Sequence, residues 1–333
     1  MPFELGVPDT EVGHTTLATH DVVGPVTTKG AAMGKKGKKG QAGKPKKLTP
    51  KDVGKRLNAL AKKVEEELEG ADLFAPLLPT EDCAICLVPL SRLSSQKFYQ
   101  ACCGNEICKA CCIENEESIN KQNEKNADNK DKKPIPFSCP FCREPNPPGL
   151  EYLRQLHARG LQNDHKAFTL AGEIYRVGGR AGEIPKDELK ALDCWIQAIE
   201  LGSPEACVDI GNIYDHGNGV AVDKGKAALF YRMGALRGDI AAHHNIGFAE
   251  YNIFGNHEIG IRHWKIAAEA GSQVSLDALK KIYNADGKKP AKKFISKECM
   301  DSLYRACHAF QEGVKSEERE KHCTDDVAAN MKC

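Results

Sequence analysis

The sequence ACVDIGNIYDHGNGV at residues 206–220 belongs to a unit whose landmark residues return along the C-terminal half of the chain. Three sets of residues follow one another at the same intervals of 36 and 33 positions: Trp195, Tyr231 and Trp264; Gly202, Gly238 and Gly271; Ala198, Gly234 and Ala267. A period of roughly 34 residues is typical of helix–turn–helix repeats. One such hairpin cannot bury both of its faces, so neighbouring units stack into a solenoid. We therefore predict an α-solenoid over residues 150–287.

Small and aromatic residues hold fixed places within each unit. Three or four residues separate a glycine from the tyrosine that follows it in each unit: Gly172 and Tyr175, Gly211 and Tyr214, Gly247 and Tyr251. We expect the small residues where two helices cross closely, and a large aromatic residue between one unit and the next. The first unit is three residues longer, and a loop at 180–185 can absorb the difference.

A second stretch, between residues 83 and 142, holds nine of the chain's 15 cysteines. Six of the nine form Cys-x2-Cys pairs and the other three lie between these pairs: Cys83/Cys86, Cys108/Cys111 and Cys139/Cys142, with Cys102, Cys103 and Cys112. Two residues between cysteines let a tight turn direct both sulfurs at one tetrahedral ion. Three such pairs so close together favour two zinc ions over disulfides or scattered buried thiols.

The zinc predicted here would be structural. All its candidate ligands are thiolates, and the pattern offers no position for a water molecule. A unit of about 60 residues that is largely loop has too small a core to fold alone. Structural zinc supplies on the order of 10–16 kcal/mol of apparent binding energy, which becomes folding energy. We expect this cysteine-rich module to span residues 80–148.

The N-terminal segment, residues 1–48, is predicted to be a disordered basic arm. Residues 29–47 carry eight lysines and no acid, and such a run cannot bury enough apolar surface to offset its ordering entropy. The arm could serve nuclear localisation or contact nucleic acid. A solubilising tail is the alternative, because no aromatic residue is interleaved to stack on bases.

The segment 49–70 is predicted to be an amphipathic helix. Thr49 and Pro50 are typical of an N-cap and a first helical position, and apolar residues then recur at helical spacing. We expect this helix to pack on the cysteine-rich module, with a short dimerising coiled coil as the alternative. At the other end of the chain, residues 288–333 are predicted to form a linker, a capping helix for the solenoid and a frayed tail.

Composition limits the compartments and partners. The net charge of +1 gives no global attraction to nucleic acid or membrane. No window approaches the ~20 apolar residues of a membrane span, and the acids of the first 30 residues argue against a secretory signal. With cysteines spaced for metal and not for disulfides, we expect the cytosol or the nucleus.

The repeat sequence resembles the Sel-one-like family. Residues 206–220 are similar to its Leu-Gly-x-x-Tyr element and its Gly-x-Gly-Val turn, and residues 223–227 are similar to its Asp-x-x-Lys-Ala element. The resemblance covers about 160–287 and implies a right-handed superhelix of helix pairs that binds protein partners. The third unit departs from the pattern, because residues 251–256 lack the Gly-x-Gly turn, and we expect a shorter loop there.

The cysteine-rich module resembles the RING finger, and the whole chain looks like a RING-type protein with C-terminal Sel-one-like repeats. In the RING pattern the ligand pairs interleave around two ions. The resemblance therefore implies two ligand sets: Cys83, Cys86, Cys108 and Cys111 for site one, and Cys102, Cys103, Cys139 and Cys142 for site two. The fold class expected is mainly α, with a small cross-braced two-zinc module followed by the solenoid.

Site two departs from the RING pattern at one ligand. A common RING reads Cys-x-His-x2-Cys, but Asn105 stands in the histidine's place and no histidine occurs from 83 to 142. An amide is a poor zinc ligand beside thiolates. We expect Cys102 and Cys103 to close the site together, with Cys112 as the alternative to one of them and an incomplete second site as a further alternative.

The resemblance also implies a function. RING ligases hold a ubiquitin-loaded conjugating enzyme in a reactive geometry, which is catalysis by positioning with no covalent nucleophile. The matching positions here are Ile85 and Pro140, as apolar contacts for the conjugating enzyme, and Arg143, as the cation that bonds it to ubiquitin. The repeats would then hold a substrate or scaffold protein. The alternative is a non-enzymatic adaptor with a structural zinc module, and a weaker one is nucleic-acid association through the basic arm.

Overall fold

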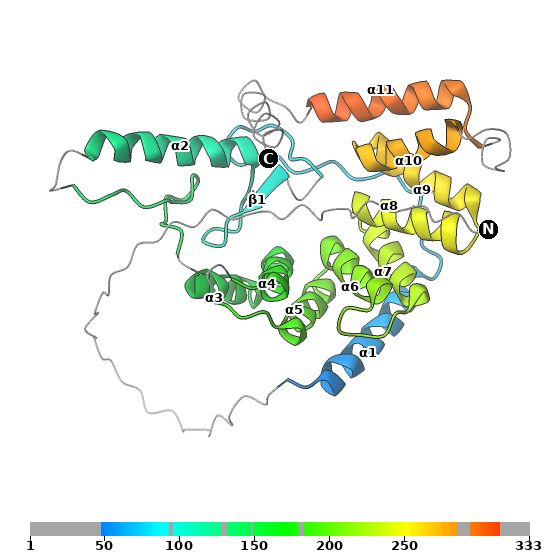
Figure 1. The fold of residues 1–333 in the computed structure, drawn as a ribbon, viewed down its shortest axis with the longest axis horizontal. Coiled ribbons are helices and arrows are strands. Elements are labelled where there is room, and N and C mark those ends of the chain that lie inside the picture. The colour runs from blue at the N-terminus through cyan, green and yellow to red at the C-terminus, as the bar shows by residue number, and fades with distance from the viewer. Residues whose placement is uncertain are drawn as a thin grey trace, which may run out of the picture.

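The computed structural model describes residues 48–92, 96–127, 132–147, 149–179, 183–284 and 294–313. The predicted basic arm and the frayed tail lie almost entirely outside these residues. The described elements are two strands, a run of α-helices and one π-helix: β1 (Lys97–Tyr99), β2 (Glu106–Cys108), α1 (Pro50–Leu68), α2 (Lys109–Asn126), α3 (Gly149–Gly160), α4 (His165–Val177), α5 (Glu188–Glu200), α6 (Pro204–His216), α7 (Lys224–Leu236), α8 (Ile240–Phe248), η3 (Ala249–Ile253), α9 (His257–Glu269), α10 (Gln273–Asn284) and α11 (Lys297–Gly313). The chain is thus mainly helical (Figure 1).

The repeats form the antiparallel pairs α4–α5, α6–α7 and α8–α9, which stack side by side. Local sequence fixes where their helices start and stop. Ser203 caps α6 by accepting the Ala206 N–H, and Pro204 takes the first helical position, where its missing N–H costs nothing. Gly217 ends α6 with φ of 78°, a left-handed conformation that glycine adopts without strain. Asp223 then caps α7.

A glycine of the first helix faces an aromatic side chain of the second helix in every unit. A Cβ on Gly172 would lie 2.5 Å from the Trp195 indole nitrogen, and one on Gly211 would lie 2.5 Å from the Tyr231 ring. The aromatic residue therefore fills the gap between the two helices of its own unit. The sequence placed it between units, and that detail was wrong.

The third unit has the shorter connection that its missing Gly-x-Gly turn predicted, and irregular helix precedes it. α8 continues directly into the π-helix η3, and α9 begins at His257 after a short connection. Glu250 within η3 is 3% exposed and pairs with Arg232 of α7, at 2.5 Å between Nη2 and Oε1. Its other carboxylate oxygen accepts from the Asn256 side chain at 2.7 Å. These contacts tie the shortened connection to the second unit.

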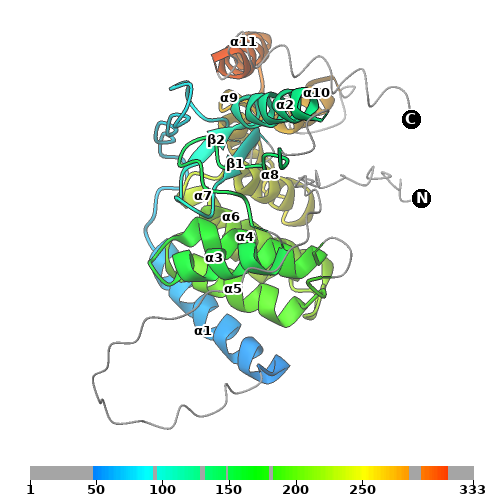
Figure 2. The same cartoon turned by 90° about the vertical axis from the view of Figure 1, so that its left-hand side faces the viewer.

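Helix α1 packs on the repeats. Its apolar stripe, with Val53, Leu57 and Val64 each 1% exposed, joins the same hydrophobic cluster as Trp195 and Phe230. Its neighbours are α5 and α7. Figures 1 and 2 place it on the opposite side of the repeats from the β1–β2 hairpin. The prediction that it would pack on the cysteine-rich module is therefore wrong, although the stripe itself is buried.

At the far end of the repeats, α11 lies on α9 and α10. Met300, Leu303 and Cys307 are buried there, in a cluster with Trp264 and Leu276. Among the described residues, none of the helices combines the length and the apolar character needed to span a bilayer.

Candidate metal centres

The first cysteine pair sits in a tight turn that its own backbone closes. The Leu87 N–H donates to the Cys83 carbonyl at 2.9 Å, and the Cys83 N–H donates to the Val88 carbonyl at 2.9 Å. Leu87, directly after Cys86, has φ of 57°, which is the left-handed region. This reversal directs both sulfurs of the pair to one side.

The third pair repeats this turn. The Arg143 N–H donates to the Cys139 carbonyl at 3.0 Å, and the Cys139 N–H donates to the Glu144 carbonyl at 2.8 Å. Arg143, directly after Cys142, has φ of 66°. The two Cys-x2-Cys sequences thus form the same tight turn, as their shared spacing predicted.

Site one brings together the four cysteines that the sequence assigned to it. The sulfurs of Cys83, Cys86, Cys108 and Cys111 lie within 4.8 Å of one another, and those of Cys86 and Cys108 are 3.9 Å apart. Tetrahedral zinc with Zn–S near 2.3 Å needs about 3.8 Å between sulfurs, so the cluster fits that ion. The Cys108 N–H donates to the Cys83 sulfur at 3.3 Å, and the Cys111 N–H donates to the Cys108 sulfur at 3.5 Å.

The β1–β2 hairpin and α2 supply the second pair. Cys108 ends β2, where it lies opposite Lys97, and it is also the N-cap of α2. Ile107 is fully buried beside it. The ligand pair therefore sits at the junction of the module's strand and its helix, so its placement depends on both elements.

Site two brings together its four assigned cysteines as well. The sulfurs of Cys102, Cys103, Cys139 and Cys142 lie within 4.8 Å of one another, with 3.8 Å between those of Cys103 and Cys139. Asn105 is outside this group, as its poor ligand chemistry suggested. Its amide nitrogen instead donates to the Cys103 sulfur at 3.3 Å. Each group could hold one metal ion.

The electrostatics of the two groups are compatible with a bound cation. Burial opposes ionisation of Cys83, but backbone N–H groups, that of Cys108 foremost, outweigh it and lower the thiol pKa to about 7. Burial and the neighbouring thiols raise the pKa values of Cys102 and Cys111. Four thiols so close together cannot all ionise alone, and a bound divalent cation is what stabilises them as thiolates.

Cys112 lies outside both groups. Its sulfur faces Glu116 at 3.8 Å, and burial together with that carboxylate raises its thiol pKa to about 12. The structure therefore does not group Cys112 with the site-two cysteines, and the assignment of Cys102 and Cys103 stays a prediction. We expect Cys112→Ser to keep two zinc ions per chain and Cys103→Ser to weaken one of them at least tenfold, measured by metal analysis after dialysis against a weak chelator. One ion in Cys112→Ser would contradict this assignment.

The three predicted contact residues differ in exposure. Ile85 is 41% exposed on the first turn, and Arg143 is exposed on the second. Pro140 is buried, and the exposed apolar side chain of that turn is the neighbouring Phe141, at 50%. Leu87, which the sequence did not single out, is 73% exposed beside Ile85. Leu87 follows Cys86 directly, as Arg143 follows Cys142, and this shared position in the sequence could have identified Leu87 as a candidate contact.

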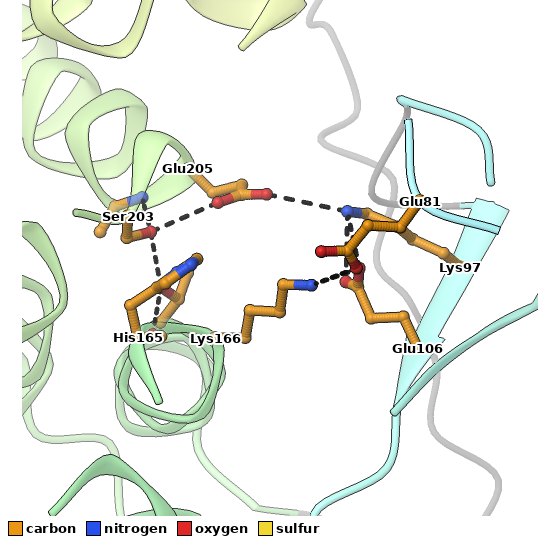
Figure 3. A network of polar contacts seen from close by, with 9 residues as sticks. Glu81, Lys97, Glu106, His165, Lys166, Ser203 and Glu205 are labelled. Carbon is orange, nitrogen blue, oxygen red and sulfur yellow. Dashed lines mark hydrogen bonds and ion pairs between the residues drawn. The ribbon is translucent and has the colours of Figure 1, made fainter. Parts of the chain in front are cut away.

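The cysteine-rich module is fixed to the repeats by a polar network at its hairpin (Figure 3). The Glu106 side chain, 10% exposed, lies between Lys97 of β1 at 3.2 Å and Lys166 of α4 at 2.9 Å. Burial opposes its ionisation, but the two lysines outweigh this and lower the carboxyl pKa. Lys166 also pairs with Glu81 at 3.0 Å, and Lys97 lies 3.8 Å from Glu205 of α6. No local sequence pattern indicates the pairs that Lys166 makes, because its partners Glu81 and Glu106 lie 85 and 60 positions away along the chain.

Comparison with known proteins identifies the repeats. The family model of the Sel1 repeat matches residues 170–203, 204–239 and 241–272, and these units are Sel1 repeats. The match does not include the cysteine-rich module. No curated protein matches this chain.

Similar solved structures include a Sel1 repeat protein from Oxalobacter formigenes, which is 27% identical with a TM-score of 0.40. The match covers 48% of this chain and 64% of that one. A protective antigen of uropathogenic Escherichia coli with an SLR fold is 20% identical with a TM-score of 0.39, over 48% of this chain and 33% of that one. An immunity protein from Pseudomonas aeruginosa is 17% identical with a TM-score of 0.33, over 48% and 74%. This chain thus spans less than two thirds of the first two.

Proposed function

We propose that this chain is a zinc-binding, RING-type ubiquitin ligase. Its cysteine-rich module would recruit a ubiquitin-conjugating enzyme, and its Sel1 repeats would hold a protein substrate or a scaffold. The observation that carries the proposal is the interleaving of the ligand pairs. The pair at 83/86 clusters with the pair at 108/111, while 102/103, which lies between them in sequence, clusters with 139/142.

Zinc is the ion that best suits both groups. Sites made of four thiolates select zinc or iron–sulfur clusters over the hard cations, and a closed tetrahedral set is typical of structural zinc. In such a site zinc supplies folding energy and no chemistry. The role of the cysteines would then be to fix the positions of the two exposed turns, after Cys86 and after Cys142.

These turns offer the surface that recruitment needs. Ile85 and Leu87 present apolar side chains from the first turn, and Phe141 presents one from the second. Arg143 adds an exposed cation at the end of the second turn. In this proposal Phe141 replaces the buried Pro140 as a contact, and Pro140 shapes the turn. A conjugating enzyme held there would have its ubiquitin thioester oriented for attack, and orientation alone can lower the barrier substantially.

The experiment is an autoubiquitination assay of the full chain with a panel of conjugating enzymes. We expect chain formation with at least one of them, and a loss of about tenfold or more in Ile85→Ala and in Arg143→Ala. Truncating an interface hot spot costs about 2 kcal/mol or more, and about 1.4 kcal/mol is already tenfold. Leu161→Ala and Arg154→Ala are the matched controls. Both side chains are exposed on or after α3, at 78% for Leu161 and 73% for the Arg154 side chain, and both variants should keep full activity.

If the wild-type chain forms no ubiquitin chains with any conjugating enzyme, the ligase proposal is wrong and the adaptor function takes its place. The adaptor has support of its own, because Sel1 repeats generally mediate protein–protein interaction. The weaker proposal of nucleic-acid binding depends on residues 29–47, outside the described residues. It requires salt-dependent binding to RNA or DNA that is lost when residues 29–47 are deleted.

A further inference from the structure

The loop that carries Cys102 and Cys103 is hydrogen-bonded to a helix outside the cysteine-rich module. Arg159 of α3 donates from Nε to the Ala101 carbonyl at 2.7 Å and from Nη2 to the Cys102 carbonyl at 3.1 Å. A guanidinium presents its donors as a rigid planar fork, so one side chain fixes two successive peptide groups. The backbone of a predicted site-two ligand is thus held by a residue that follows the last cysteine of the module, Cys142.

The same side chain is held in place by an acid at the start of α4. Asp164, the N-cap of α4, lies 3.9 Å from Arg159 Nη1 and accepts the Tyr99 hydroxyl at 2.6 Å. Burial and this acceptor raise the Tyr99 pKa, so the phenol stays protonated and donates. Tyr99 ends β1, one residue before the loop begins to turn. Asp164 therefore contacts both Tyr99, just before the loop, and Arg159, which binds the loop backbone.

Packing and backbone geometry agree with this arrangement. Ala101 is 3% exposed and belongs to a hydrophobic cluster with Leu153 and Leu156 of α3. Gly104 has φ of +78°, and a Cβ on it would lie 2.5 Å from Arg159 Nη1 and 3.3 Å from Asp164. The loop at 101–104 is thus shaped to receive the arginine, and part of it lies in the core of the helical region.

Site one is organised differently. Its sulfurs accept from backbone N–H groups of the module itself, those of Cys108 and Cys111. The repeats reach its neighbourhood through flexible lysine and carboxylate side chains, Lys166 with Glu81 and Glu106. Side-chain ion pairs of this kind hold the hairpin against α4 without fixing the peptide group of a ligand.

We infer that the helical region completes the second metal site: Arg159 is a positioning residue for the ligand Cys102, and retention of the second zinc ion depends on it while retention of the first does not. The inference rests on the metal binding in the proposed function, but not on ligase activity. When a residue that orients a metal ligand from outside the coordination shell is removed, the metal affinity typically falls by about 10–100-fold.

The test compares full-length wild type, Arg159→Gln and the control Arg154→Gln, all loaded with two equivalents of Zn²⁺. Arg154 lies on the same helix with its side chain 73% exposed, paired with Glu151. The release of zinc to a chromogenic chelator is followed over time. We expect one of the two ions to leave Arg159→Gln at least tenfold faster than wild type, and Arg154→Gln to match wild type.

Alkylation of the loaded proteins, mapped by mass spectrometry, shows which site has opened. In Arg159→Gln the four cysteines of site two should gain reactivity while those of site one stay protected. Gly104→Ala should reproduce the effect, because its Cβ displaces the arginine. Equal release of both ions, or retention of both at the wild-type rate, would overturn the inference. A wild-type chain that binds no zinc would instead defeat the zinc binding in the proposed function.

Discussion

Removing the metal from the loaded chain should unfold the cysteine-rich module and leave the repeats helical. The module's buried cluster consists of six of the described residues, and three of these are the predicted ligands Cys83, Cys108 and Cys111. Among the described residues, Leu90, Ile107 and Ala110 supply its buried hydrocarbon side chains, with Ala84 and Phe98 packed partly buried against them, and so small a core cannot offset the ordering entropy of the whole unit. The metal is expected to supply the difference, on the order of 10 kcal/mol.

Hydrogen exchange of the full chain, with and without a strong chelator, measures this. Backbone amides of β2 and of the first turn of α2 should lose protection by several orders of magnitude. Amides of α5, α6 and α7 should change little, because their core contains no predicted metal ligand. Cys108→Ser should act like chelation at site one, while Cys299→Ser, which alters a half-buried cysteine of α11, serves as its control. Unchanged protection of β2 in the chelated chain would contradict a structural role for the metal.

The grouping of the cysteines could be predicted because each Cys-x2-Cys pair forms a local turn. Two intervening residues suffice to close the turn, and the backbone hydrogen bonds at Cys83 and Cys139 join residues that are four or five positions apart. Assigning pairs to sites took the RING resemblance in addition, since spacing alone does not say which pairs share an ion. The repeats could be predicted equally well, because a fixed sequence period indicates a repeated helix pair without knowledge of what packs around it.

The docking of these parts could not be predicted in the same way. The stripe of Val53, Leu57 and Val64 indicated that one face of α1 is buried, but a stripe carries no information about which surface covers it. Arg159 meets the loop at Ala101 across 58 positions of sequence, and no local pattern sets this arginine apart from Arg154 on the same helix. Contacts of this kind depend on the complementarity of two folded surfaces, which only the structure supplies.

The second large effect is expected in the first repeat, where Trp195 packs against Gly172. Trp195 is 1% exposed and its indole nitrogen donates to the Thr169 carbonyl at 3.2 Å. Trp195→Ala should lower the free energy of unfolding by about 3–5 kcal/mol, because a large buried side chain leaves a cavity. Gly172→Ala should cost about 1–3 kcal/mol, because its Cβ would lie 2.5 Å from the indole nitrogen. Urea unfolding of the metal-loaded chain measures both changes.

Combining the two changes makes the prediction sharper, since the sign of the glycine effect should reverse. In the Trp195→Ala background the added Cβ meets empty space, and alanine is then favoured over glycine in the middle of α4 by about 1 kcal/mol. The coupling free energy between the two sites should therefore reach about 2 kcal/mol or more. Gly54→Ala in α1 is the control, because no atom lies within 4 Å of its added Cβ, and it should stabilise the chain in either background. If Gly172→Ala changes the free energy of unfolding equally with and without Trp195, the added Cβ must clash with some other neighbour. The pairing of small and aromatic residues would then no longer explain the spacing of these residues in the repeats.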